Sequence, residues 1–127
     1  QLGSPPNVHL LQLDTSSRES IIAATNEIKE KYNGQLDVVI NNAAIAARDN
    51  SLEATRTTFA TNYYGVKMLN EHLIPLLREH GRVVNVASTV GPMVSYLFSK
   101  KLQEMYTSPT LTTQELDSIV QDFLSAF

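Results

Sequence analysis

The chain has 127 residues, 43% of them hydrophobic and none of them cysteine, and its formal net charge is −3 at pH 7. This length suits a single domain, and the slightly acidic balance offers no basic field to attract nucleic acid or anionic lipid. The lack of cysteine excludes disulfides, thiolate nucleophiles and cysteine-based zinc sites, and it agrees with a reducing, cytoplasmic location.

A strand and a helix are predicted first. Residues 8–13 are a short apolar run after a cluster of Gly, Ser and Pro, and Asp14 closes the run, so we expect a strand. Ser16 and Glu19 have the spacing of a capping box, which predicts the start of a helix. Its apolar positions repeat at helical spacing until residues 33–34, an Asn-Gly pair that stops it.

A second strand, a long helix and a third strand follow. Residues 36–40 are apolar at nearly every position, which is typical of a strand buried on both faces. Residues 53–79 are predicted to form a helix in which Pro75 causes a kink or an irregular last turn. Gly81 then releases the chain into a strand at residues 82–87, which contains three valines.

The last third of the chain predicts one more helix. Gly91 and Pro92 are expected to break whatever follows the third strand. Thr112 before Glu115 repeats the capping pattern, and an apolar stripe follows at helical spacing. The stripe consists of Leu116, Ile119, Val120, Phe123, Leu124 and Phe127. Such a helix needs a surface to cover.

The alternation of strands and helices implies an α/β fold with parallel strands joined by right-handed crossovers. Asn41 and Asn42 follow the second strand directly, and Ser88 follows the third. Open α/β sheets bind their ligands at the carboxyl edge of the strands. We therefore expect these polar side chains to line one functional site.

The stretches LDVVINNAAIA, TNYYG and GRVVNVAS, in this order and at these separations, resemble the middle of a short-chain dehydrogenase/reductase. The tail is similar to the helical insertion of the carbonyl reductases in that family. The resemblance implies a partial Rossmann-like, doubly wound parallel sheet that lacks the first two strands and the catalytic Tyr/Lys helix. Residues 1–127 would then be the central part of a single NAD(P)-binding domain.

The resemblance also implies a set of cofactor contacts. Asp14 matches the acidic residue that bonds the adenine ring, with Thr15 beside it. Asn42 matches the residue that lies against the cofactor ribose, in a turn that continues with Ala43. Val86 would face the nicotinamide. The expected cofactor is NADPH.

Two residues match catalytic positions of the family. Ser88 matches the serine that hydrogen-bonds the substrate carbonyl as negative charge develops on it. Asn62 matches the helix asparagine whose backbone holds a water in the proton relay. The implied reaction is NADPH-dependent reduction of small aldehydes, ketones or quinones. The implied protein is a monomer, because the insertion covers the surface through which other members dimerise, and it has no nucleic-acid or membrane partner.

The sequence departs from the family pattern in three places. Ala44 replaces a glycine, and no Gly-rich phosphate-binding turn is present. Tyr96 and Lys100 have the family's Tyr-Lys spacing, but Tyr96 follows Ser88 by only eight residues. We interpret this pair as exposed residues of a loop or short helix. The chain also begins with Gln1 and stops within a helical pattern, so we expect a fragment. The missing proton donor and phosphate-binding turn predict that this fragment is inactive.

Simpler interpretations remain open at each position. Asp14 could serve only in a turn, Ser88 could cap the turn that follows it, and Asn41 with Asn42 could be a structural turn. Asn62 could simply face solvent. At the level of the whole protein, the alternatives are a non-catalytic truncated or degenerate relative that acts by association, and a flavodoxin-like binding domain.

Overall fold

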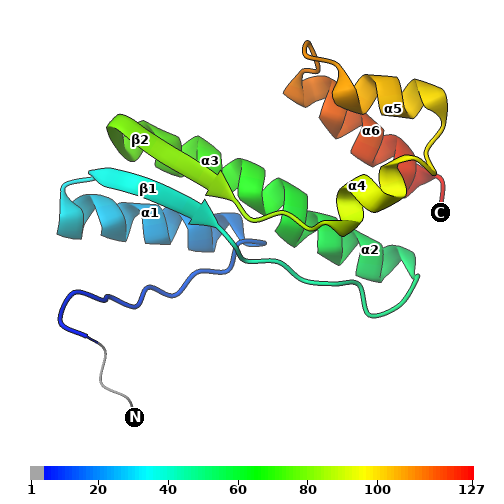
Figure 1. Cartoon of the computed structure of the whole chain (residues 1–127). Coiled ribbons are helices and arrows are strands. Elements are labelled where there is room, and N and C mark those ends of the chain that lie inside the picture. Colours follow the sequence, from blue (N-terminus) through cyan, green and yellow to red (C-terminus); the bar gives the residue numbers. More distant parts are fainter. Residues whose placement is uncertain (1–4) are drawn as a thin grey trace.

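The structure, a computed structural model, describes residues 5–127 (Figure 1). Two strands form a parallel sheet, and helices follow or precede each of them. The strands are β1 (Leu36–Asn41) and β2 (Leu77–Asn85). The helical segments are α1 (Arg18–Tyr32), α2 (Leu52–Phe59), η1 (Ala60–Gly65), α3 (Val66–Leu73), η2 (Ile74–Leu76), α4 (Val90–Ser95), α5 (Lys100–Thr107) and α6 (Thr113–Ser125).

Helix α1 begins one residue later than the sequence predicts. Its N-cap is Ser17, whose Oγ accepts a hydrogen bond from the Ser20 N–H at 3.2 Å. Ser16 is instead part of the preceding turn, since its N–H and its hydroxyl both donate to the carboxylate of Asp14. The predicted end is confirmed, since Asn33 adopts the left-handed conformation with φ of 54°.

The predicted parallel pairing of the two central strands is confirmed. Residues 38–41 of β1 pair in register with residues 82–85 of β2, and the Val86 N–H extends the ladder by donating to the Asn41 carbonyl at 3.0 Å. The pairing begins earlier than expected, because Leu36 already pairs with Leu77. Between these two points β1 advances by two residues and β2 by five, so residues 78–81 bulge out of the ladder.

Only one face of the sheet is covered by the described residues. Helices α1 and α3 lie on the same side, contact each other, and enclose a core of Ile21, Val39, Leu69 and Leu73 (Figure 1). On the other face, four side chains are 43–62% exposed, namely Val38, Ile40, Val84 and Val86. The prediction that β1 is buried on both sides is therefore wrong for residues 5–127, because both neighbouring helices pack on one face.

The long helix predicted for residues 53–79 is interrupted and shorter. The π-helix η1 lies in its middle, between α2 and α3. The whole helical segment ends in the 3₁₀ turn η2, which contains Pro75. Because proline cannot donate to the preceding turn, the helix stops there and residues 77–79 join β2 instead.

The strand predicted for residues 8–13 is not formed. These residues have no regular structure and are mostly exposed, with Leu10 at 86%. A strand needs a neighbour to satisfy its backbone groups, and no other strand pairs with this segment in the described part of the chain. The turn predicted before it is present where the structure describes it, since the Val8 N–H donates to the Pro5 carbonyl; Gly3 and Ser4 lie outside the described residues.

The tail contains three helices rather than one. Gly91 and Pro92 do not break the chain but lie in the first turn of α4, where proline is tolerated. Helix α6 has the predicted capping box of Thr112 and Glu115. Its stripe buries Ile119, Val120 and Leu124, whereas Phe123 stays about half exposed at 51%. Within residues 5–127, no helix has the length and apolarity to cross a membrane.

Candidate functional site

The carboxyl ends of β1 and β2 open into one crevice with a volume of about 710 Å³. The crevice is lined by Asn41, Asn42, Ala43, Ala44, Asn62, Val66, Asn85, Val86, Ala87 and Ser88. Five of the seven predicted site residues thus meet at one edge of the sheet. Asp14 and Thr15 do not line this crevice.

A buried asparagine, Asn41, connects the elements at the base of the crevice by hydrogen bonds. Asn41 is 7% exposed, and its Nδ2 donates to Oδ1 of Asn85 on β2 at 2.7 Å and to Oδ1 of Asn70 on α3 at 2.9 Å. One side chain therefore fixes both strand ends and the helix beneath them. Its Oδ1 is buried and has no hydrogen-bond donor among the described residues. This arrangement supports a structural role for Asn41 and leaves the exposed Asn42 free to face the crevice.

Asn62 holds the loop after β1 against the π-helix. Its Nδ2 donates to the Ile45 carbonyl at 2.8 Å, and its Oδ1 accepts from the Ile45 N–H at 2.9 Å. The side chain is exposed, but its amide is paired with a peptide group instead of facing only water. A π-turn at a functional position is a recurrent feature of helices. Sequence reasoning placed Asn62 at the site but gave no signal for this clamp.

Ser88 caps the turn that follows it, as the simpler interpretation of this residue predicts. Its Oγ accepts a hydrogen bond from the Val90 N–H at 3.1 Å. A hydroxyl has one donor and two acceptor positions, so accepting this bond leaves its own hydrogen available. The cap therefore orients the hydroxyl and still allows it to donate to a ligand in the crevice.

Asp14 and Thr15 form a tight turn before α1. Oδ1 of Asp14 accepts from the N–H and the hydroxyl of Ser16 at 2.9 and 2.6 Å, and these two hydrogen bonds lower the pKa of the carboxyl group. The carbonyl of Thr15 lies so close to Gly65 of η1 that a Cβ at residue 65 would come within 2.3 Å of it. The turn interpretation is thus geometrically correct, and Oδ2 of Asp14 has no hydrogen-bond partner in residues 5–127.

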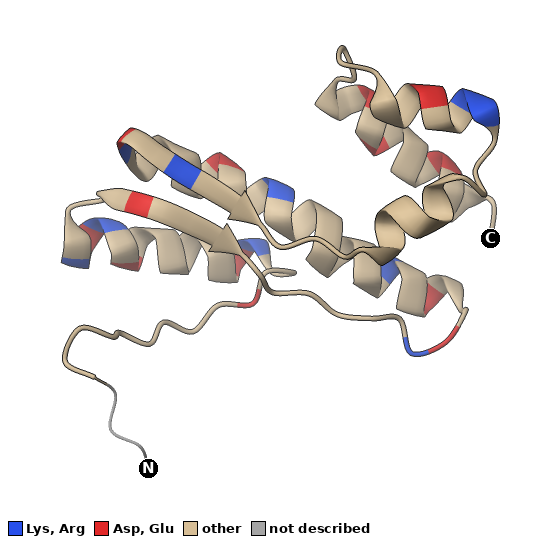
Figure 2. Cartoon of the chain, viewed as in Figure 1, with Lys and Arg blue, Asp and Glu red and all other residues tan. Residues whose placement is uncertain are grey.

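The crevice carries no formal charge. Residues 38–47 and 83–99 contain no Asp, Glu, Lys or Arg, and Figure 2 shows the ends of both strands and the whole of α4 without charged residues. The lining consists of amide, hydroxyl and small apolar groups. It can hydrogen-bond and pack against a neutral group, but it offers no side-chain anion or cation.

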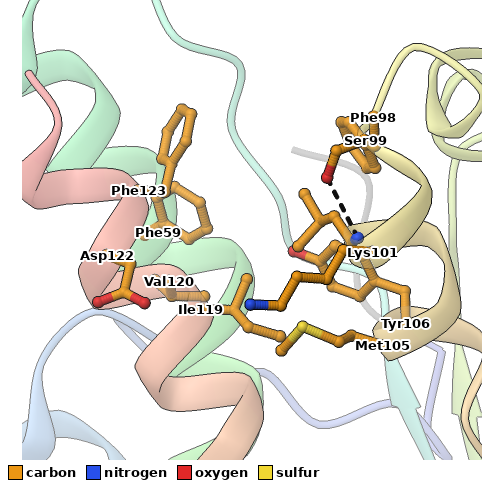
Figure 3. A pocket seen from close by; sticks show the side chains of 11 residues that line it. Phe59, Phe98, Ser99, Lys101, Met105, Tyr106, Ile119, Val120, Asp122 and Phe123 are labelled. Atoms are coloured by element: carbon orange, nitrogen blue, oxygen red, sulfur yellow. Dashed lines mark hydrogen bonds between the residues drawn. The ribbon is translucent and has the colours of Figure 1, made fainter.

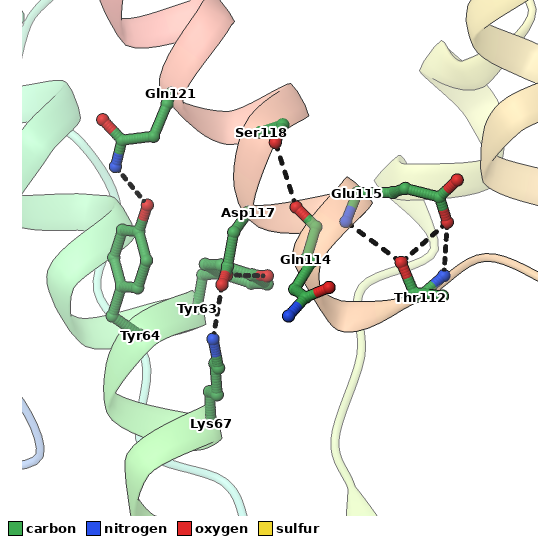
Figure 4. Close-up of polar contacts among 9 residues, drawn as sticks. All are labelled: Tyr63, Tyr64, Lys67, Thr112, Gln114, Glu115, Asp117, Ser118 and Gln121. Atoms are coloured by element: carbon green, nitrogen blue, oxygen red, sulfur yellow. Dashed lines mark hydrogen bonds and ion pairs between the residues drawn. The ribbon is translucent and has the colours of Figure 1, made fainter.

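Neither Tyr-Lys pair of the chain reaches the crevice. Tyr96 follows α4 directly and is 68% exposed, and Lys100 begins α5 and is also exposed, which confirms that this pair is exposed. Sequence reasoning overlooked Tyr63 and Lys67, which have the same spacing in TNYYGVK. Both bind the carboxylate of Asp117 on α6, at 2.7 and 2.6 Å (Figure 4).

The environment of Tyr63 shifts its pKa in the direction opposite to the one that an acid-base catalyst needs. Burial and the hydrogen bond to Asp117 raise the pKa of Tyr63 far above its ordinary value, whereas catalysis at neutral pH needs a lowered one. Lys67 and Tyr63 together hold the pKa of Asp117 below its ordinary value. The trio anchors α6 to η1 and α3, assisted by a hydrogen bond from Gln121 to the Tyr64 hydroxyl at 2.6 Å.

No group of three potential metal ligands among His, Cys, Asp and Glu gathers anywhere in residues 5–127.

The sequence model of the short chain dehydrogenase family matches residues 1–107. Among curated proteins, the chain is 37% identical to carbonyl reductase [NADPH] 1 of Sus scrofa over 126 residues and 34% identical to that of Homo sapiens over 127 residues. Both alignments cover 96% of this chain but only 43% and 44% of the relative. The chain thus spans less than half the length of these proteins.

Solved structures agree in fold. Menthone neomenthol reductase from Mentha piperita matches with a TM-score of 0.78 and 26% identity, over 90% of this chain and 53% of that one. NADPH-bound carbonyl reductase from chicken fatty liver matches with a TM-score of 0.61 and 22% identity, over 84% and 49%. These likenesses bear out the partial Rossmann-like sheet.

Proposed function

Because this chain belongs to the short chain dehydrogenase family, we propose that its crevice is the nicotinamide and substrate end of an NADPH-dependent carbonyl reductase site. The observation that supports the proposal most is the convergence of Asn42, Asn62 and Ser88, which come from three separate elements, on one uncharged cavity. The activity is proposed for a protein of the relatives' length, since this chain spans less than half of them.

The residues of the crevice suit the cofactor end that we assign to them. Asn42 and Ala43 follow β1 and offer a polar and a small group to a ribose, while Val86, 59% exposed, offers an apolar surface to a flat ring. Asp14 and Thr15 are proposed to hold the adenine end, with the free Oδ2 of Asp14 as the acceptor. When bound, NADPH supplies the hydride for the carbonyl carbon.

Ser88 and Asn62 have different proposed roles. The Ser88 hydroxyl donates to the carbonyl oxygen of the substrate, where negative charge develops, and its bond from Val90 keeps it in position. Asn62 fixes the loop at Ile45 through both of its amide atoms. Its main chain is proposed to hold a water of the proton relay. The substrates are small aldehydes, ketones or quinones, and the proposed protein is a cytoplasmic monomer.

A second candidate is a non-catalytic product that acts by association. It is favoured by the Tyr-Lys pairs, because Tyr96 is exposed and Tyr63 is engaged by Asp117, so neither can donate a proton in the crevice. Loss of a positioned proton donor typically lowers a rate by about 10² to 10⁴. We therefore expect the isolated 127-residue chain to be inactive.

The test is NADPH consumption with menadione, a small quinone, measured by absorbance. We expect turnover from a protein that carries this segment at the relatives' length, and a reduction in kcat of about 10² to 10³ for Ser88→Ala, as for loss of one oxyanion donor. Thr89→Ala, one residue away and outside the crevice lining, is the matched control. Absence of turnover with aldehyde, ketone and quinone would reject the reductase proposal, and turnover by the isolated chain would reject its expected inactivity.

A further inference from the structure

A second cavity lies away from the crevice, between α2, α5 and α6. It is an open groove of about 560 Å³ and shares no residue with the crevice at the strand ends. Its volume lies within the range of roughly 300–1,000 Å³ typical of small-molecule sites. Most of its lining is apolar or aromatic and includes Phe59, Leu102, Met105, Ile119, Val120 and Phe123 (Figure 3).

One lysine, Lys101, lines this apolar groove, and it is an exposed residue. The Lys101 side chain runs among the lining side chains in Figure 3, and it forms no ion pair with any acidic group in residues 5–127. Asp122 also lines the groove but lies too far from Lys101 to pair with it. An ammonium group beside an apolar surface gains most from a ligand that brings one negative group and a hydrocarbon body.

We propose that this groove binds a small amphiphilic monocarboxylate, such as a medium-chain fatty acid. The hydrocarbon part packs against the side chains of α5 and α6, and the carboxylate accepts a hydrogen bond from Lys101. Among the described residues, Lys101 is the one Lys or Arg in the lining of the groove, which is why a single carboxylate is specified. The site is separate from the proposed reductase site, so either proposal can fail without the other.

The three methionines of the chain provide a built-in reporter for the test. Met105 lines the groove, Met68 packs against the core beneath the sheet, and Met93 is exposed on α4. Decanoate is titrated into the chain, below its micelle-forming concentration, while the methionine methyl signals are followed by NMR. Decanol, of the same chain length but neutral, is titrated in parallel. We expect a saturable shift of Met105 with both probes, no shift of Met68, and tighter binding of decanoate.

Charge variants test the role assigned to Lys101. Lys101→Met keeps the apolar stem and is expected to weaken decanoate about tenfold, as for one lost charge-assisted hydrogen bond, while decanol binding stays unchanged. Lys100→Met removes the neighbouring charge, which is outside the lining, and is expected to change neither probe. The proposal is overturned if Met105 does not shift, if decanol binds as tightly as decanoate, or if the two lysine variants weaken decanoate equally.

Discussion

Because Gly65 has no side chain, two segments that are distant in the sequence can come into contact. Gly65 is buried at the end of η1, and the carbonyl of Thr15 occupies the space where a Cβ would stand. This contact places the Asp14–Thr15 turn against the same helix that carries Asn62. The close contact between the Thr15 carbonyl and Gly65 thus connects the proposed adenine end with the proposed catalytic end.

Gly65→Ala is expected to destabilise the chain by about 1–3 kcal/mol, the usual cost of overpacking a close contact. The obstacle is backbone rather than a flexible side chain, so the Thr15 turn must shift. Urea unfolding measures the effect. Gly91→Ala is the matched control, because nothing lies within 4 Å of the Cβ that it adds. Equal stability of the two variants would contradict the contact.

Single site residues were predictable where strand register alone decides their place. Asn42 and Ser88 come shortly after the valine-rich runs of two strands, and parallel pairing then brings both to one edge. The clamp of Asn62 on Ile45 and the contact of Gly65 with Thr15 were not predictable, because each depends on the path of a loop. Tyr63 and Lys67 could have been found from their spacing, although only the structure reveals Asp117 between them.

At the scale of elements, α6 is held by a compact set of polar contacts over an apolar base. Asp117 accepts from Tyr63 and Lys67, and Phe123 packs against Phe59 of α2 with ring centres 5.8 Å apart. The amphipathic stripe predicted a helix that must cover a surface, and the structure shows that this surface includes α2.

The Asp117 anchor is expected to weaken in acid. Because Lys67 and Tyr63 lower the pKa of Asp117 in the folded chain, the anchor contributes fully above the ordinary carboxyl pKa of about 4 and is lost as the pH falls through the lower folded value. The melting temperature of Asp117→Asn should lie below that of the unaltered chain at pH 6, and the gap should close in acid. Asp122→Asn, on the same helix but without an ion pair, should show no such closure. A gap that stays constant with pH would refute the anchor.

Helix and strand predictions failed where tertiary context decides. Residues 8–13 have the composition of a strand but no partner to hydrogen-bond with in the described part of the chain. Gly91 and Pro92 were expected to end structure, yet both fit the first turn of a helix. The π-helix at residues 60–65 carries no local sequence signal, whereas both Asn-Gly and the Thr-Glu capping box predicted helix ends correctly.

At the scale of the whole molecule, the described residues cover one face of the sheet and leave the other exposed. Parallel sheets are normally covered on both faces, and contiguous exposed apolar side chains mark surfaces that associate. The exposed Ile40 lies near the centre of that face, with Val84 as its partner on β2. The α/β class followed from the order of elements, but the one-sided covering could not be foreseen from the apolar character of β1.

The isolated chain is therefore expected to self-associate through this face. Ile40→Lys should shift the population towards monomer in sedimentation velocity, because a charge at the centre of the apolar face opposes its burial. Ile74→Lys places the same charge on η2, at a residue that is also half exposed, and should leave the distribution unchanged. A concentration-independent monomer in the unaltered chain would contradict the expectation.

The bulge at residues 78–81 determines where residues can be inserted into the chain. Residues 78–81 leave the ladder and return at Arg82, and every pairing that reaches the crevice is fixed after that point. His80 has a positive φ of 65°, and the Arg78 side chain donates to the Asp37 carboxylate at 2.9 Å. Residues 78–81 therefore form a turn at the amino end of the sheet. Inserted residues or a short tag would be tolerated there, remote from Asn42 and Ser88, whereas one residue added after Arg82 would rotate every following side chain to the opposite face.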